Sequence, residues 1–157
     1  MAALPGIDEK MIRLNPEWSV DNAASTALEQ ELSVNDFKGK RLIITLPGAG
    51  GFCNKEIDLI KENMDALKAA GADEVIIIVA TDILSNAGRD VANLLQDIDL
   101  SFGKANNLGL DGVRSRYLNR AVIAVDANGE QLAREDAPLL ACRTLEALVG
   151  VAKGAFN

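Results

Sequence analysis

The hydrophobic pattern of the chain predicts a strand, a helix and a second strand between residues 42 and 80. Residues 42–46 and 74–80 are short runs rich in β-branched and other apolar side chains, as is typical of buried strands. Four apolar residues between them recur every three or four positions: Ile57, Ile60, Met64 and Leu67. This spacing places them on one face of a helix, with Gly71 as its expected end. The segment therefore predicts a parallel βαβ unit with a right-handed crossover.

The C-terminal part of the chain predicts a hairpin and a closing helix. Residues 120–125 and 130–134 flank the turn 126–129, whose Asn-Gly pair accepts the positive φ angles that such turns need. The closing helix is expected from about Arg143, with one apolar stripe formed by Leu145, Leu148, Val149 and Ala152. A βαβ unit, a hairpin and a closing helix, in this order, predict an α/β protein of the thioredoxin-like fold, with a central mixed sheet flanked by helices.

The remaining segments have weaker patterns. The expected elements are a short strand beginning at Trp18 and Val20, a strand over 28–34, a turn over 36–40, a helix over 85–95, a strand over 98–102 and a helical turn over 103–108. Neither a repeat nor a low-complexity tract interrupts the sequence. We therefore expect a single domain over residues 1–157.

Composition and charge narrow the range of partners. The chain has 157 residues, 48% hydrophobic and 25% charged, as expected of one globular domain. Its net charge of −7 gives no field that would attract nucleic acid or an anionic membrane, and Arg114 and Arg116 are predicted to lie in a solvated basic loop. The longest apolar run, residues 75–80, is far shorter than the roughly 20 residues of a membrane helix. Residues 1–10 lack the features of a secretory signal, so the sequence predicts a cytoplasmic protein.

The chain has no histidine and two cysteines, Cys53 and Cys142. Without histidine, the Cys-His protease pair and most zinc sites are excluded, and the sequence predicts neither a metal nor a cofactor. Two cysteines 89 positions apart are too few for the disulfide framework of a small secreted protein. They are therefore either buried hydrophobic residues or redox groups.

Cys53 follows a predicted buried strand and stands at the start of the predicted helix. The unpaired N–H groups and the dipole of a helix N-terminus would stabilise a thiolate there. The alternative is a small buried side chain in a tight turn. The preceding Gly48-Ala49-Gly50 also begins like a dinucleotide-binding fingerprint, but Cys53 stands where that pattern needs its third small residue, and Asp82 is too distant for its acidic residue.

Several short stretches together resemble the peroxiredoxins, and among them the peroxiredoxin-5 type, the atypical two-cysteine members. The resembling stretches are Lys38-Gly39-Lys40-Arg41, Leu46-Pro47-Gly48-Ala49, Cys53-Asn54-Lys55-Glu56, Lys68-Ala69-Ala70-Gly71-Ala72, Thr81-Asp82 and Asn119-Arg120-Ala121-Val122-Ile123. The similarity covers about residues 30 to 150 and is weakest in the middle. It implies a thiol peroxidase that reduces hydrogen peroxide or alkyl hydroperoxides, takes electrons from a thioredoxin or glutaredoxin, and forms a homodimer.

The resemblance also implies roles for four residues. Cys53 would be the peroxidatic cysteine, which becomes a sulfenic acid, and Pro47 would shield its thiolate. Arg120 would hold the thiolate and the peroxide oxygen; from the residues alone, a surface cation beside an edge strand is the alternative. Cys142 precedes the last helix, where the family's resolving cysteine lies, and would close a disulfide with Cys53. A buried structural cysteine is the alternative for Cys142.

The active-site loop departs from the family pattern in two ways. Pro47 stands six positions before Cys53 instead of seven, and Gly50 takes the place of the family's threonine. Loss of a positioned hydroxyl donor costs on the order of 10²-fold or more in other catalytic sites. A second interpretation therefore stays open, in which the chain is a weak or inactive redoxin that acts as a redox sensor or binding protein.

Overall fold

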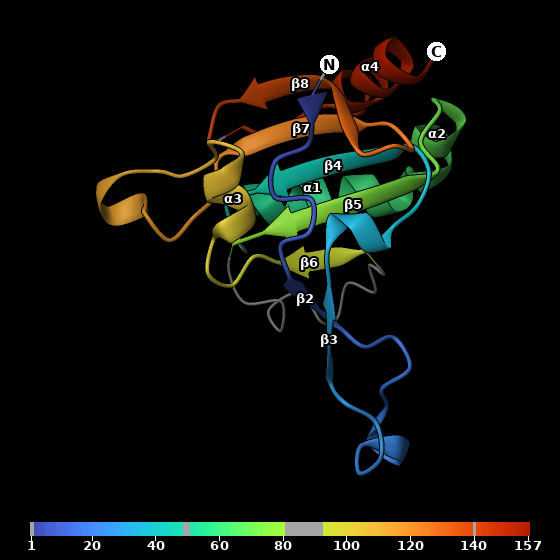
Figure 1. The fold of residues 1–157 in the computed structure, drawn as a ribbon, viewed down its shortest axis with the longest axis vertical. Coiled ribbons are helices and arrows are strands. Elements are labelled where there is room, and N and C mark those ends of the chain that lie inside the picture. Colours follow the sequence, from blue (N-terminus) through green and yellow to red (C-terminus); the bar gives the residue numbers. More distant parts are fainter. Residues whose placement is uncertain (1, 49–50, 81–92, 140) are drawn as a thin grey trace.

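The computed structural model describes residues 2–48, 51–80, 93–139 and 141–157, and its centre is one mixed sheet (Figure 1). The sheet has eight strands in the order β1-β8-β7-β4-β5-β6-β2-β3. Helices lie on both of its faces, which confirms the predicted α/β thioredoxin-like fold. Among the described residues, none of the helices is both long and apolar enough to span a bilayer.

The predicted βαβ unit forms the middle of the sheet. Strands β4 (Arg41–Leu46) and β5 (Glu74–Val79) are parallel, with Leu42 opposite Val75 and Leu46 opposite Val79. Every residue of β4 is buried, because both of its faces are covered and it has a neighbouring strand on each side. A continuous apolar run is the sequence pattern of such a strand.

The single helix predicted between these strands is two helices, α1 (Gly51–Glu62) and α2 (Met64–Ala69). The break is at Asn63, whose side-chain amide donates a hydrogen bond of 2.8 Å to the Leu59 carbonyl. An asparagine that bonds the backbone of the preceding turn competes with helix continuation. The apolar face persists across the break, since Ile57, Ile60 and Leu67 are all fully buried.

The hairpin and the closing helix are confirmed. Strand β7 (Arg120–Val125) pairs antiparallel with β8 (Glu130–Ala137) on one side and with β4 on the other. In the turn only Gly129 has a positive φ, of 85°, while the Asp126 carboxylate accepts from the backbone N–H groups of Asn128 and Glu130. Helix α4 (Leu145–Phe156) starts after Thr144, whose hydroxyl accepts from the Ala147 N–H.

The N-terminal strands differ from the prediction. Strand β1 (Ala2–Ala3) pairs with β8, and β2 (Met11–Leu14) pairs with β3 (Glu29–Leu32), which falls inside the predicted strand 28–34. The strand predicted at Trp18 and Val20 is wrong, because that segment lies beyond the paired part of the hairpin and contains the short 3-10 helix η1 (Val20–Asn22). A second 3-10 helix, η2 (Val34–Asp36), ends at the first residue of the predicted turn 36–40.

The segment after β5 also differs. The predicted helix 85–95 lies mostly outside the described residues, and its last two residues belong to strand β6 (Leu94–Gln96). The strand predicted over 98–102 is wrong, because helix α3 (Ser101–Ala105) begins there. The buried carboxylate of Asp97 accepts hydrogen bonds from the backbone N–H groups of Phe102 and Gly103. These N–H groups belong to the first turn of α3 and have no carbonyl partner within the helix, so Asp97 favours a helix at this position.

The sheet separates two hydrophobic cores. Helices α1, α2 and α4 pack on one face, and Cys53 belongs to their cluster together with Leu46 and Ile57. The other face is covered by α3 and by the N-terminal segment, with Phe102 and Leu118 in its cluster. The C-terminal ends of β4 and β5 and the start of β7 lie at the same end of the central strands (Figure 1). The candidate site is built at this end of the strands.

Candidate active site

Cys53 lies in the first turn of α1, on the helix face that packs against the sheet. Only 6% of the residue is exposed. Pro47, which directly follows β4, is half-buried. Residues 49 and 50 lie outside the described residues; they belong to the Gly48-Ala49-Gly50 stretch and include the glycine that stands in place of the family's threonine.

The structure brings Arg120 to Cys53. Arg120 is the first residue of β7, which runs antiparallel to β4 and therefore starts where β4 ends. Its Nη2 lies 3.5 Å from Cys53 Sγ, and its Nε donates to the Leu139 carbonyl at 2.7 Å. The interpretation of Arg120 as a surface cation is wrong, since 1% of the residue is exposed.

A buried carboxylate, Glu56, joins the cysteine helix to two arginines. Glu56 stands three residues after Cys53, so both side chains lie on the same face of α1. Its Oε1 accepts from Arg120 Nη1 at 3.1 Å and from the backbone N–H of Arg143 at 3.0 Å. Its Oε2 lies 2.7 Å from Arg143 Nη2, and the whole residue is inaccessible to solvent.

Arg143 closes this network against the end of β4. Besides its bonds to Glu56, its Nη2 donates to the Thr45 carbonyl at 3.0 Å. The Thr45 hydroxyl in turn accepts from the Ala121 N–H at 2.9 Å and donates to the Asn119 carbonyl at 2.9 Å. These bonds tie the segment before α4 to β4 and β7, so the position of Arg120 is set by three parts of the chain.

The network carries one excess positive charge next to the sulfur. Two guanidinium groups, of Arg120 and Arg143, face the single carboxylate of Glu56, and all three side chains are more than nine-tenths buried. An uncompensated charge in a buried cluster is costly, so the arrangement favours an anion close to Arg120. A thiolate at Cys53 would be such an anion.

Cys142 lies beside this network, directly before Arg143 in the sequence. Its Sγ is 3.7 Å from the Arg143 carbonyl, and the residue is half-buried. Burial raises the pKa of the Cys142 thiol, and the Glu56 carboxylate raises that pKa further, against the smaller opposite effect of Lys55, Arg120 and Arg143. Cys142 is therefore a thiol at neutral pH within electrostatic reach of the charges around Cys53.

Sequence reasoning missed Glu56, Arg143 and Thr45 as parts of the site. The signal for Glu56 was available, because a carboxylate three residues after Cys53 and one before Ile57 falls on the face that must be buried. Arg143 offered no such signal, since a basic residue before a helix is common on surfaces. Within the described residues, no group of three His, Cys, Asp or Glu side chains could hold a metal ion.

Comparison with known proteins finds one sequence relative among the curated proteins and many solved structures of the same fold. No family model matches the sequence. Peroxiredoxin-2F, mitochondrial, of Oryza sativa subsp. japonica is 31% identical over 121 residues, which are 71% of this chain and 59% of that protein. The chain thus spans less than two thirds of this relative's length.

Several solved structures share the fold. Reduced Prx3 of Vibrio vulnificus in complex with H2O2 superimposes with a TM-score of 0.73 at 18% identity, covering 96% of both chains. AhpC of Mycobacterium tuberculosis has a TM-score of 0.71 at 13% identity, covering 97% of this chain and 95% of that one. A putative thioredoxin reductase of Burkholderia cenocepacia has a TM-score of 0.73 at 21% identity, covering 96% and 94%.

The chain is similar in sequence to this peroxiredoxin, and it shares the fold of the solved structures above. The comparisons support this family in general, as the resemblance predicted. They give no support to the peroxiredoxin-5 type in particular, so that narrower assignment is not upheld. The similarity to a peroxiredoxin rests on the 121-residue alignment, the solved structures show the fold alone, and the site described above rests on the contacts of this chain.

Proposed function

We propose that the chain is a thiol-dependent peroxidase in which Cys53 is the nucleophile and Arg120 its electrostatic partner. The observation that carries the proposal is the position of Arg120 Nη2, 3.5 Å from Cys53 Sγ inside a buried network with an excess positive charge. A guanidinium beside a sulfur in the first turn of a helix favours the thiolate, which is the reactive form. The similarity to a peroxiredoxin supports the same activity.

The proposed reaction needs only the chain, the peroxide and a proton from solvent. The Cys53 thiolate attacks one peroxide oxygen, so that an S–O bond forms as the O–O bond breaks. Cys53 becomes a sulfenic acid, and the departing hydroxide or alkoxide takes up a proton from solvent and leaves as water or an alcohol. Arg120, held by Glu56 and the Leu139 carbonyl, would stabilise the negative charge as it moves from sulfur to oxygen. Pro47 would shield the thiolate from solvent.

The proposed return to the thiol uses Cys142. Its thiolate would attack the sulfenic sulfur, so that the S–S bond forms as the S–O bond breaks and the departing hydroxide takes up a proton from solvent and leaves as water. A thioredoxin or glutaredoxin would then reduce the Cys53–Cys142 disulfide. In support, Cys142 lies next to Arg143, which is bonded to Glu56 one helical turn after Cys53. The resolving role of Cys142 is part of the proposal.

The direct test of the peroxidase is the reaction of the reduced protein with one equivalent of hydrogen peroxide. We expect rapid consumption of the peroxide and a sulfenic acid that a dimedone probe traps at Cys53, located by mass spectrometry of tryptic peptides. Free cysteine at the same concentration and pH is the reference. A reaction no faster than that of free cysteine, or dimedone found only at Cys142, would contradict the proposal.

Closure of the disulfide is expected to accelerate with pH. Because the pKa of Cys142 is raised, the thiolate that attacks the sulfenic acid is a minor species at neutral pH. We expect the rate of appearance of the intrachain disulfide to rise by about tenfold per pH unit up to at least pH ~8.5, the ordinary range of a thiol pKa. Rapid-quench samples analysed by non-reducing mass spectrometry measure it. A rate independent of pH across this range would exclude Cys142 as the resolving thiol.

The substrate, the reductant, the oligomeric state and the location are proposed from the family resemblance. Hydrogen peroxide is the first candidate substrate, in agreement with the complex of Prx3 from Vibrio vulnificus, and alkyl hydroperoxides are the second. A homodimer and a cytoplasmic location are likewise proposed. A steady-state assay with hydrogen peroxide or an alkyl hydroperoxide, and with a thioredoxin or a glutaredoxin as reductant, compares the four combinations directly.

A weakly catalytic redoxin is the second candidate, because Gly50 stands where the family has threonine and the loop before Cys53 is one residue shorter. Such a protein would form the sulfenic acid or the disulfide once and act as a redox sensor or binding protein. It would show negligible turnover with either reductant. Turnover well above the uncatalysed oxidation of thiols would exclude this second candidate.

A further inference from the structure

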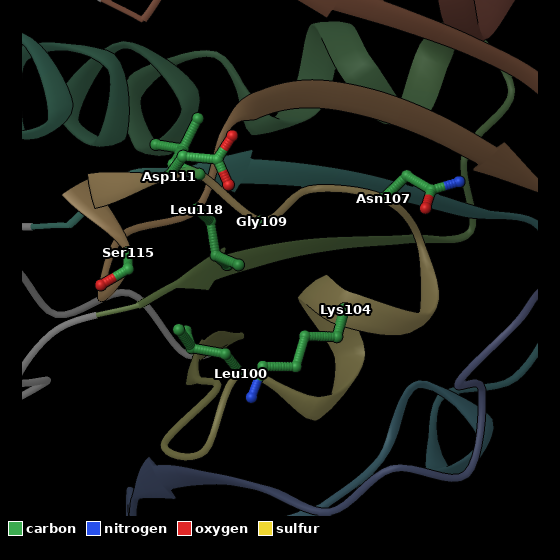
Figure 2. A pocket seen from close by; sticks show the side chains of 8 residues that line it. Leu100, Lys104, Asn107, Gly109, Asp111, Ser115 and Leu118 are labelled. Atoms are coloured by element: carbon green, nitrogen blue, oxygen red, sulfur yellow. The ribbon is translucent and has the colours of Figure 1, made fainter. Parts of the chain in front are cut away.

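We propose that a pocket beside α3 binds a small zwitterion with an apolar body, of which an α-amino acid with an aliphatic side chain is the simplest example. The pocket lies between α3 and residues 107–118, which lead to β7 (Figure 2). It is on the sheet face that Phe102 and Leu118 cover, whereas Cys53 packs on the opposite face. The inference therefore does not rest on the proposed peroxidase activity.

The pocket has an apolar floor. Its volume is about 640 Å³, within the range of about 300 to 1,000 Å³ that is usual for pockets that hold small molecules. Leu118 is fully buried, and the half-buried Leu100 and Leu110 also line the pocket. These three side chains offer the aliphatic body of a ligand a surface away from water.

Opposite charges stand on the two walls of the pocket. Figure 2 shows Lys104 on the α3 wall and Asp111 on the wall formed by the segment that leads to β7. Within the described part of the chain, neither side chain forms an ion pair, and both are exposed. A lysine and an aspartate that are held on separate walls complement the carboxylate and the ammonium group of one ligand.

The two walls are joined by hydrogen bonds, so the pocket is formed before any ligand binds. The Leu108 N–H donates to the Gly103 carbonyl at 2.8 Å, and the Asn119 N–H donates to the Leu108 carbonyl at 2.8 Å. Leu118 packs so closely on α3 that a Cβ atom at Gly103 would clash with its Cδ2 atom. A preformed site avoids the entropic cost of ordering its walls around the ligand.

The backbone of the pocket is strained at two positions. Leu100 has a φ of 61° and Asn107 a φ of 55°, and no other described residue except glycine has a positive φ. Both residues line the pocket. A left-handed conformation is particularly unfavourable for a leucine, and such strain tends to be kept at binding sites. The strain is thus a reason, separate from the charges, to infer a ligand here.

The lining disfavours other classes of ligand. Asp111 would repel a phosphate group held by Lys104, so a nucleotide or another polyanion fits poorly. The described lining residues also include no aromatic side chain on which a nucleobase could stack. Arg114 and Arg116 are exposed, as predicted for a solvated loop, and neither is among the described lining residues. A ligand with balanced charges and an aliphatic body therefore fits best.

The test is a titration of the reduced, ¹⁵N-labelled full-length protein with L-leucine, followed by the chemical shifts of the backbone amides. We expect a dissociation constant of about 1 mM or lower, with the largest changes in residues 100–118. Leucine amide lacks the carboxylate and N-acetyl-leucine lacks the ammonium group, so each should bind at least about fivefold more weakly. No saturable change up to about 20 mM leucine, or equal affinities for the three compounds, would overturn the inference.

Two variants identify which wall holds which group. Lys104→Met should weaken the binding of leucine at least about fivefold but should not further weaken that of leucine amide, which has no carboxylate to lose. Asp111→Asn should likewise weaken the binding of leucine and spare N-acetyl-leucine. Lys153→Met is the matched control, because it removes the same charge from an exposed position of α4 and should leave the affinity unchanged.

If Lys104→Met and Asp111→Asn bind leucine as tightly as the parent, the assignment of the pocket is wrong. Because the titration contains no peroxide, neither outcome bears on the proposed peroxidase, which the reaction at Cys53 tests separately.

Discussion

Replacing Cys53 by serine is expected to reduce peroxide consumption by on the order of 10³-fold or more, because the hydroxyl is a far weaker nucleophile than the thiolate that it replaces. Serine is nearly the same size as cysteine, so the packing of α1 on the sheet should persist. The measurement is peroxide consumption in an NADPH-coupled thioredoxin assay, with circular dichroism to verify the fold.

Cys142→Ser is the matched control for this substitution. Cys142 is half-buried and lies beside the network, so the variant should still react with the first equivalent of peroxide at the parental rate. It should lose only the intrachain disulfide and the turnover that depends on it. If Cys53→Ser consumes peroxide as fast as the parent, Cys53 is not the nucleophile and the proposed function is wrong.

Replacing Glu56 by glutamine is expected to destabilise the protein by about 3 to 5 kcal/mol, the usual cost of removing one partner from a buried ion pair. Glutamine keeps the size of the side chain and one acceptor oxygen, so the loss reports on charge and not on a cavity. Without the carboxylate, Arg120 and Arg143 would be two buried cations with no opposing charge between them.

The measurement is the free energy of unfolding in urea, for the reduced proteins. Glu62→Gln is the control, because it makes the same chemical change at an exposed position of the same helix and should alter stability by less than about 0.5 kcal/mol. Equal stabilities of the two variants would show that the Glu56 network does not hold the folded state together.

The parts of the fold that were predicted correctly are those in which local pattern and burial coincide. Strands β4, β5 and β7 are buried over nearly their whole length, and buried strands in the middle of a sheet have continuous apolar sequences. The errors lie in segments whose secondary structure depends on tertiary contacts. Asp97 selects a helix after β6, and the segment at Trp18 and Val20 continues beyond the last paired residues of its hairpin.

The residues of the candidate site also differ in whether a local sequence pattern predicted them. Cys53 was found from the strand-to-helix turn, a local feature. Arg120 and Cys142 came from the family resemblance, and the structure places the first against Cys53 and the second beside Arg143. Their roles in catalysis remain predictions for the experiments above.

The sequence by itself determined the α/β class, the central βαβ unit, the hairpin and a cysteine at the start of a helix, because each is encoded in short-range periodicity. Only the tertiary structure decided what surrounds that cysteine. Arg120 lies 67 positions after Cys53 and contacts its sulfur directly, because β7 runs antiparallel to β4. Arg143 lies 90 positions after Cys53 and is linked to the site through Glu56, because the segment before α4 crosses the end of β4. Long-range pairing of charges in a buried space leaves no periodic trace in a sequence, and it is this pairing that makes Cys53 a candidate for chemistry.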